Sequence, residues 1–222
     1  MFRDAWLVAG KDLRIELRSR IGINQILPFA LLVLVLFAFA LDPDTGMLDR
    51  ATPGLYWVAV LFCAVLAIQR AFAIEAADGN RDALRLSGLD PAGIYLGKMA
   101  AIATQLLVLE VLLGIGVLLL YTSHATGWLL PMATCVAATA GIAAAGTLYG
   151  VLAAGLRVRE TLLPLLLLPV LSPVLIGSVR AFEAARNATP GDGWPWVGLL
   201  AVFALAYIIF GAFGFGPLLE ES

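Results

Sequence analysis

Charged side chains are scarce in this chain. Asp, Glu, Lys and Arg together make up only 14% of its 222 residues, and the formal net charge is −2. Soluble globular domains carry about 25% charged residues, spread over every surface that faces water. So little charge excludes an ordinary soluble domain of this size. No basic stripe runs along a candidate surface either, so the sequence predicts no nucleic-acid partner.

Residues that bind metals or carry redox chemistry are also few. The chain has two cysteines, Cys63 and Cys135, and one histidine, His124. Both cysteines lie inside long apolar runs and form no CxxC pair, so we interpret them as packing residues that report no redox compartment. HExxH and GxSxG motifs are absent from the sequence. The sequence therefore predicts neither catalytic residues nor a metal site.

A phosphate-binding loop is missing as well. The pattern G-x-x-x-x-G-K-[ST] is not present, since Gly97-Lys98 is followed by Met99 and position 92 is Ala. Such a loop cradles the phosphates of ATP with backbone amides and a lysine. We therefore expect that the chain does not hydrolyse ATP itself, and that any energy for transport comes from another subunit.

Apolar residues fill most of the sequence instead. They account for 61% of the chain, and they gather into six long segments. A span of about 20 residues crosses a bilayer's hydrocarbon core, and only a helix satisfies its own backbone groups there. Because the first segment is longer than a signal-peptide core, we interpret it as a retained span. The fold class predicted is all-α, with six transmembrane helices in a single domain (residues 1–222), at about 21–41, 54–74, 99–121, 128–156, 161–179 and 197–217.

The N-terminal segment, residues 1–20, mixes charge with a regular apolar pattern. Phe2, Trp6, Leu13 and Leu17 recur at helical spacing opposite a charged face. That pattern is typical of a helix lying in the membrane interface. An ordinary cytoplasmic lead-in to the first span is the alternative.

Basic residues are distributed unevenly between the two sides of the predicted bundle. The N-terminus carries five, residues 70–98 carry four, and the turn before the fifth span carries two. The opposite side carries Arg50, Arg180 and Arg186. Cytoplasmic loops are enriched in Lys and Arg. We therefore predict that both termini are cytoplasmic.

The longest cytoplasmic connection, residues 75–98, is charged yet contains regularly placed apolar residues. Asp90-Pro91 is a plausible helix start, because proline is favoured at the first helical position, and Ser87-Gly88 would end a preceding short helix. Two short amphipathic pieces would suit docking onto a soluble partner protein. A solvated loop without a partner is the alternative.

Polar and helix-breaking residues within the spans are candidate functional positions. Glu110 lies midway along the third span, where an ionisable group costs about 2–3 kcal/mol and must face protein or water. It would mark a transport path or subunit contact, or else be a packing residue bonded to Thr104 or Gln105. Three prolines in the fifth span should bend or break that helix, as a moving element or as a packing kink. They are Pro164, Pro169 and Pro173.

Two further features have simpler interpretations. Small residues at four-residue spacing in the fourth span, such as Gly141 and Gly150, predict close packing between helices, within one chain or at a homodimer seam. His124, in the outer turn before that span, is a weak candidate for haem or metal ligation, because a lone histidine is more often an exposed loop residue.

Four stretches of the sequence together resemble a known family. They are KDLRIELRSR (11–20), PGLYWVAVLFCAVLAIQRAFAIEAADGNRDALRLSGLDP (53–91), YLGKMAA (95–101) and RVRETLLPLLLLPVLSPVLIGSVRA (157–181). The second and fourth are the specific ones, and the likeness covers nearly the whole chain. The sequence is similar to the CcmB family, the permeases of the haem exporter in cytochrome c maturation.

This resemblance implies a permease of the ABC-2 type in the cytoplasmic (inner) membrane of a prokaryote. It implies a separate ABC ATPase subunit, other haem-handling membrane subunits and a haem chaperone as partners, with haem as a transported or handled ligand rather than a resident cofactor. Trp194-Pro195-Trp196 does not reproduce the tryptophan-rich haem-handling segment of another protein in that system, so no haem-binding residue is carried over. The resemblance assigns the ATPase contact to residues 75–98, with candidate positions Glu75, Asp78, Gly79, Arg81, Leu84, Leu86, Gly88 and Pro91.

Other functions fit the same pattern of spans. An ABC-2-type permease that exports a lipid, drug or polysaccharide would have the same architecture. A membrane-embedded enzyme would need several polar groups at one depth, and the sequence offers only Glu110 in mid-span. A scaffold without transport activity is the remaining alternative.

Overall fold

The computed structural model describes residues 1–19, 22–41, 46–76, 88–121, 127–154 and 159–221. Within these ranges every regular element is a helix. In chain order they are α1 (Phe2–Ser19), the π-helix η1 (Gly22–Ile26), α2 (Leu27–Ala40), α3 (Met47–Ala76), α5 (Pro91–Leu120), α6 (Leu129–Ala154), α7 (Arg159–Arg186) and α8 (Pro190–Glu221).

Five of these helices, α3 and α5 to α8, are long and apolar enough to cross a membrane. A sixth span is counted if α1 and the helical run Asn24–Ala40, which differ in direction by 51°, are taken as one bent pair. The predicted class, an all-α multi-pass membrane protein, is thereby confirmed.

The first membrane segment is not a uniform α-helix. The apolar run at 21–41 contains the five-residue π-helix η1 followed by α2, which has only 14 residues. Pro28 lies at the start of α2 and has no N–H to donate to the preceding turn. A π-helix before this proline is a local irregularity of the kind that a missing donor permits.

Several helices instead extend beyond the apolar segments. α3 begins at Met47 and contains Pro53, and α7 continues to Arg186. α5 begins at Pro91, eight residues before the predicted third span, with Asp90 at its N-cap position. The Asp90-Pro91 helix start is as predicted, but this second amphipathic piece is the first part of α5 rather than a separate helix. Hydrophobicity marks the part of a helix that lies in lipid, and says little about where the helix ends.

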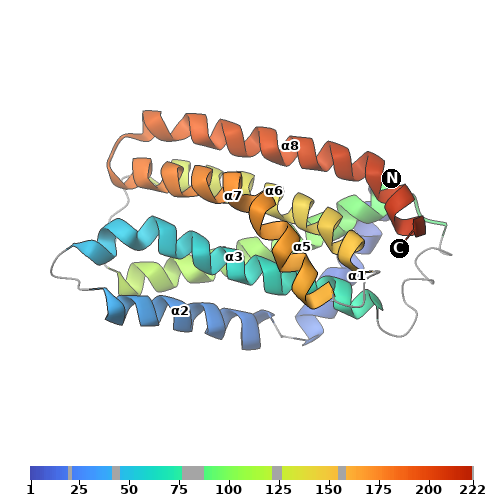
Figure 1. The fold of residues 1–222 in the computed structure, drawn as a ribbon, viewed down its shortest axis with the longest axis horizontal. Coiled ribbons are helices and arrows are strands. Elements are labelled where there is room, and N and C mark those ends of the chain that lie inside the picture. Colours follow the sequence, from blue (N-terminus) through green and yellow to red (C-terminus); the bar gives the residue numbers. More distant parts are fainter. Residues whose placement is uncertain (20–21, 42–45, 77–87, 122–126, 155–158, 222) are drawn as a thin grey trace.

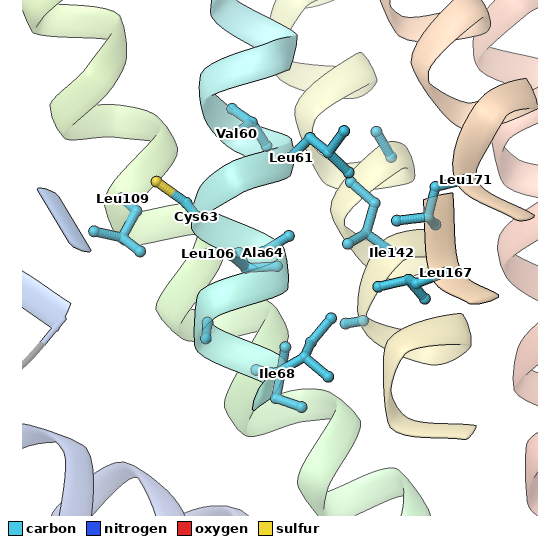
Figure 2. Packing of buried hydrophobic residues seen from close by; sticks show 14 of the residues in the cluster. Val60, Leu61, Cys63, Ala64, Ile68, Leu106, Leu109, Ile142, Leu167 and Leu171 are labelled. Carbon is cyan, nitrogen blue, oxygen red and sulfur yellow. The ribbon is translucent and has the colours of Figure 1, made fainter. Parts of the chain in front are cut away.

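The main hydrophobic core lies where α3, α5, α6 and α7 meet. Figure 2 shows Ile68 of α3, Leu106 of α5, Ile142 of α6 and Leu167 of α7 pointing into this region, and all four are fully buried. Burying a side chain of this size from water is worth about 1.5–3 kcal/mol. Inside a membrane the gain comes mainly from close packing, since lipid is as apolar as leucine.

Glycines allow α6 to pack closely against its neighbours. A Cβ added at Gly141 would lie 2.9 Å from the Phe203 ring of α8. A Cβ at Gly150 would overlap the ring of Phe72 in α3. The predicted small-residue face of the fourth span therefore serves packing within the chain.

The two termini lie at the same end of the bundle (Figure 1). α1 lies at this end too, beside the N-terminal part of α5. An arrangement with both termini on one side of the membrane requires an even number of crossings, which α2 together with the five long helices would provide.

Candidate functional site

Glu110 is the most deeply buried acidic side chain among the described spans, with 3% of its surface exposed. The hydroxyl of Thr139, on α6, donates to its Oε1, and the hydroxyl of Tyr56, on α3, donates to its backbone carbonyl at 3.0 Å. Neither expected neighbour bonds to Glu110 among the described contacts: the Thr104 hydroxyl donates to the carbonyl of Ala100, and Nε2 of Gln105 has no partner there. Thr104 lies six residues before Glu110, which places it about 120° away around the helix.

A cavity of about 440 Å³ opens beside Glu110, between α3, α5, α6 and α7. Aromatic and aliphatic side chains form most of its wall, and several of them, including Val111 and Met132, are exposed on the outer surface of the bundle. The lining residues are Thr52, Pro53, Tyr56, Leu107, Glu110, Val111, Gly114, Ile115, Val117, Leu118, Trp128, Pro131, Met132, Cys135, Val136, Phe182, Ala185 and Arg186.

Two polar atoms on the cavity wall lack partners among the described residues. One is Oε2 of Glu110, although the Cys135 thiol lies beside that carboxyl, and the other is Nε of Arg186. Nη1 of Arg186 donates to Asp49 at 2.7 Å. A buried polar atom without a partner costs about 1–3 kcal/mol. The cavity is therefore suited to an amphiphilic molecule or to water that supplies the missing hydrogen bonds.

Sequence reasoning identified Glu110 but not the residues around it. Cys135 and Thr139 are four residues apart on α6, so they share one face at the depth of Glu110. That spacing of two polar residues in an apolar run was a usable signal. The sequence gave no such signal for Tyr56 and Arg186, because only the packing of distant segments brings them to the cavity.

The three prolines lie within one continuous helix. α7 runs through Pro164, Pro169 and Pro173 without a break, and it changes direction part-way along its length (Figure 1). Each proline leaves the carbonyl four residues earlier without its helical partner. Pro169 and Pro173 are exposed, whereas Leu167 and Leu171, each two residues before one of these prolines, are fully buried. The helix is thus bent rather than broken, with Pro169 and Pro173 turned away from the core and Pro164 partly buried.

A second polar cluster fixes α1 against the N-terminal part of α5. A Cβ added at Gly97 would lie 2.6 Å from the Ala5 carbonyl, so only glycine permits this approach. Lys98, which is 1% exposed, pairs with Asp12 at 3.3 Å, and its ammonium lies 5.0 Å from the centre of the Phe72 ring. These contacts place α1 beside the start of α5.

The acidic residues of α1 all face the neighbouring helices α3 and α5. Glu16 accepts from Nε of Arg70, on α3, at 3.1 Å. Asp4 accepts from the Met1 amino group at 3.2 Å and from the backbone N–H of Asp90 at 3.4 Å. The bond from the amino group lowers the pKa of the Asp4 carboxyl. α1 is therefore attached to the helix end that precedes residues 77–87 and to the one that follows them.

The predicted ATPase contact lies largely outside the described residues. Five of its candidate positions are outside them: Asp78, Gly79, Arg81, Leu84 and Leu86. His124, the weak candidate for haem or metal ligation, also lies outside the described residues. Glu75 lies in the last turn of α3, Pro91 is the first residue of α5, and Gly88 has a φ of 67°, a conformation that glycine adopts without strain. Within the described ranges, no three His, Cys, Asp or Glu residues are grouped so as to hold a metal ion.

Nearly the whole chain is similar to one known protein family. The family model described as CcmB protein matches residues 3–222. The chain is 31% identical to a heme exporter protein B of Paracoccus denitrificans over 205 residues, which cover 91% of this chain and 92% of that one. It is 34% identical to the Haemophilus influenzae protein of the same name over 185 residues, covering 82% and 83% of the two chains.

The likeness to the Escherichia coli K12 heme exporter protein B has a similar extent. Identity there is 31% over 191 residues, covering 85% of this chain and 86% of the relative. The family model's match, residues 3–222, includes the segments that form α1, the Glu110 cavity and the proline-containing α7. The chain belongs to the CcmB protein family.

Proposed function

We propose that this chain is the transmembrane permease subunit of an ABC transporter complex in c-type cytochrome biogenesis. In this role it couples ATP hydrolysis by a separate ATPase subunit to haem export or to release of a haem-loaded chaperone. The observation that supports this most strongly is the near full-length similarity to proteins named heme exporter protein B. The bundle of long apolar helices and the missing phosphate-binding loop fit a permease that depends on an external motor.

The ATPase subunit would dock at the end of the bundle that carries both termini. Residues 75–98 connect α3 and α5 there, and α1 is attached beside the two helix ends. Arg3, Lys11, Arg14, Arg18 and Arg70 are also at this end, which agrees with a cytoplasmic location in an inner membrane. Movement of the ATPase would be passed into the membrane along α3 and α5.

Haem enters this proposal as cargo or as a ligand handled by the complex. The other haem-handling membrane subunits and a haem chaperone would complete the path. The cavity beside Glu110 has an apolar wall and two polar atoms without partners, which suits an amphiphile in transit. The bend in α7 would let the cavity wall move, since Phe182 of that helix lines it.

Deletion of the gene tests the pathway. We expect loss of covalent haem from c-type cytochromes on stained gels, with b-type haem unchanged, and restoration by the plasmid-borne gene. Normal covalent haem in the deletant would refute the proposal. It would favour instead an ABC-2-type permease that exports a lipid, drug or polysaccharide.

Charge reversal at Arg81 and Arg85 tests the docking segment separately. The double variant R81E/R85E should lower recovery of the ATPase subunit on a tagged permease, because a charged docking surface loses its complementarity. The matched control is R180E, at the opposite end of the bundle. Undiminished recovery with R81E/R85E would show that the ATPase docks elsewhere.

A further inference from the structure

Charges on α1 are separated between its two faces. Its three acidic residues, Asp4, Asp12 and Glu16, are partly buried and bonded toward α3 and α5. Its four basic residues are all exposed: Arg3, Lys11, Arg14 and Arg18. Over the whole helix the two signs of charge nearly cancel, but the ionisable residues of α1 that are classed as exposed are all basic.

An apolar stripe lies beside these basic residues. Phe2 and Trp6 are each 81% exposed and Leu17 is 72% exposed, so the largest apolar side chains of α1 do not pack against the protein. At 100° per residue, Phe2, Trp6, Leu13 and Leu17 form one stripe, and Arg3, Lys11, Arg14 and Arg18 form the next stripe around the helix. We call these two stripes together the outer face of α1.

We propose that the outer face of α1 is a binding site for anionic phospholipids. The apolar stripe would enter the boundary between headgroups and acyl chains, and the basic stripe would contact lipid phosphates just above it. Charge complementarity selects anionic over zwitterionic lipid. The proposal does not depend on haem or on the c-type cytochrome pathway.

The position of α1 favours a lipid over a protein occupant. Ser19 is followed within three residues by Gly22, where the first membrane segment begins, so the C-terminal end of α1 is held at the bilayer surface. The helix turns by 51° from the direction of that segment. Its inner face is fixed by the Lys98 and Arg70 ion pairs, so the outer face has a set orientation.

Fluorescence quenching of Trp6 tests the proposal with the full-length chain. The chain is reconstituted into nanodiscs that contain increasing mole fractions of brominated phosphatidylglycerol in phosphatidylcholine, or brominated phosphatidylcholine in phosphatidylglycerol. Subtracting the signal of W6F removes the other four tryptophans. We expect half-maximal quenching of Trp6 at a lower mole fraction of the brominated anionic lipid than of the brominated zwitterionic lipid.

Arginine variants test the role of charge. Each basic residue near an anionic surface contributes about five-fold in affinity, so R14Q should raise the half-maximal mole fraction up to about five-fold, and R14Q/R18Q further. R14K/R18K keeps the charge and should behave like the unmodified chain. High salt should reduce the preference, because the charges on this face are exposed to screening.

Two results would overturn the proposal. Equal quenching by the two brominated lipids would mean that α1 lies in the interface without selecting charge. The second result is that neither lipid quenches Trp6, but its fluorescence changes when the ATPase subunit is added. That result would assign the outer face of α1 to protein docking.

Discussion

The ion pair between Lys98 and Asp12 leads to an asymmetric prediction for α1. Lys98 is almost fully buried, whereas the Asp12 carboxylate is 19% exposed and also pairs with Lys11 at 3.1 Å. Removing one partner of a buried pair costs about 3–5 kcal/mol because the other charge stays buried. D12N should therefore cost about 3 kcal/mol, the low end of that range, since water reaches part of the site.

The reverse substitution should be much milder. K98M replaces the ammonium by an apolar side chain that still packs on the Phe72 ring, while Asp12 keeps Lys11 and water. We expect a cost of about 1 kcal/mol, and a similar cost for the double variant D12N/K98M, because it leaves no buried charge. The two substitutions are thus expected to be strongly non-additive.

Hydrogen–deuterium exchange of α1 backbone amides in nanodiscs measures these local costs directly. About 1.4 kcal/mol corresponds to ten-fold, so D12N should accelerate exchange by about two orders of magnitude and K98M by about five-fold. Exchange in α5 between Leu106 and Leu113 serves as the internal control and should not change. Equal acceleration by the two single variants, or an additive double variant, would refute the reasoning.

Three further predictions concern packing, the cavity and pH. G97A should weaken the packing of α1 on α5 by about 1–3 kcal/mol, and faster tryptic cleavage at Arg14 would show it. The control is G114A, whose added Cβ meets nothing within 4 Å and which should be neutral or slightly stabilising. E110Q should keep the Thr139 hydrogen bond and leave the melting temperature nearly unchanged. E110L should leave the Thr139 hydroxyl without its acceptor and lower the folding stability by about 1–3 kcal/mol. Equal melting temperatures for the two variants would contradict the assigned contact. The pKa of Asp4 is lowered in the folded chain, so its stabilisation of the α1 N-terminus should be complete above about pH 4, the usual value, and fade as pH falls through the folded pKa. D4N should remove this pH dependence from the protection factors of the amides there, which are the exchange rates divided into their intrinsic values at the same pH.

Local patterns in the sequence predicted the parts of this structure that depend on local physics. The apolar segments, the start of α5 at Pro91 and the amphipathic stripe of α1 all follow from hydrophobicity and helical spacing over a few turns. The sequence also indicated that Glu110 needs a protein environment. It did not identify Thr139 as the partner, because that contact joins residues 29 positions apart and depends on how α5 packs against α6.

The orientation of α1 was beyond reach for a similar reason. Periodicity placed the acidic and apolar residues on different faces, but it did not reveal which face meets the protein. In water the apolar stripe would be the buried one. Here Asp12 and Glu16 face inward because α3 and α5 supply Arg70 and Lys98, both far away in the sequence. The π-helix at the start of the first membrane segment was not foreseen, because the apolar run conceals the effect of Pro28.

The unbroken course of α5 has a mechanical consequence. Glu110 lies 12 residues beyond Lys98 on one helix, which is about 18 Å at 1.5 Å per residue. With α1 fixed at Lys98, this position acts as a fulcrum, and a tilt of α5 by about 10° would carry Glu110 sideways by about 3 Å, roughly the length of a hydrogen bond. A push on the Pro91 end would then act as on a lever, with the longer arm reaching the cavity.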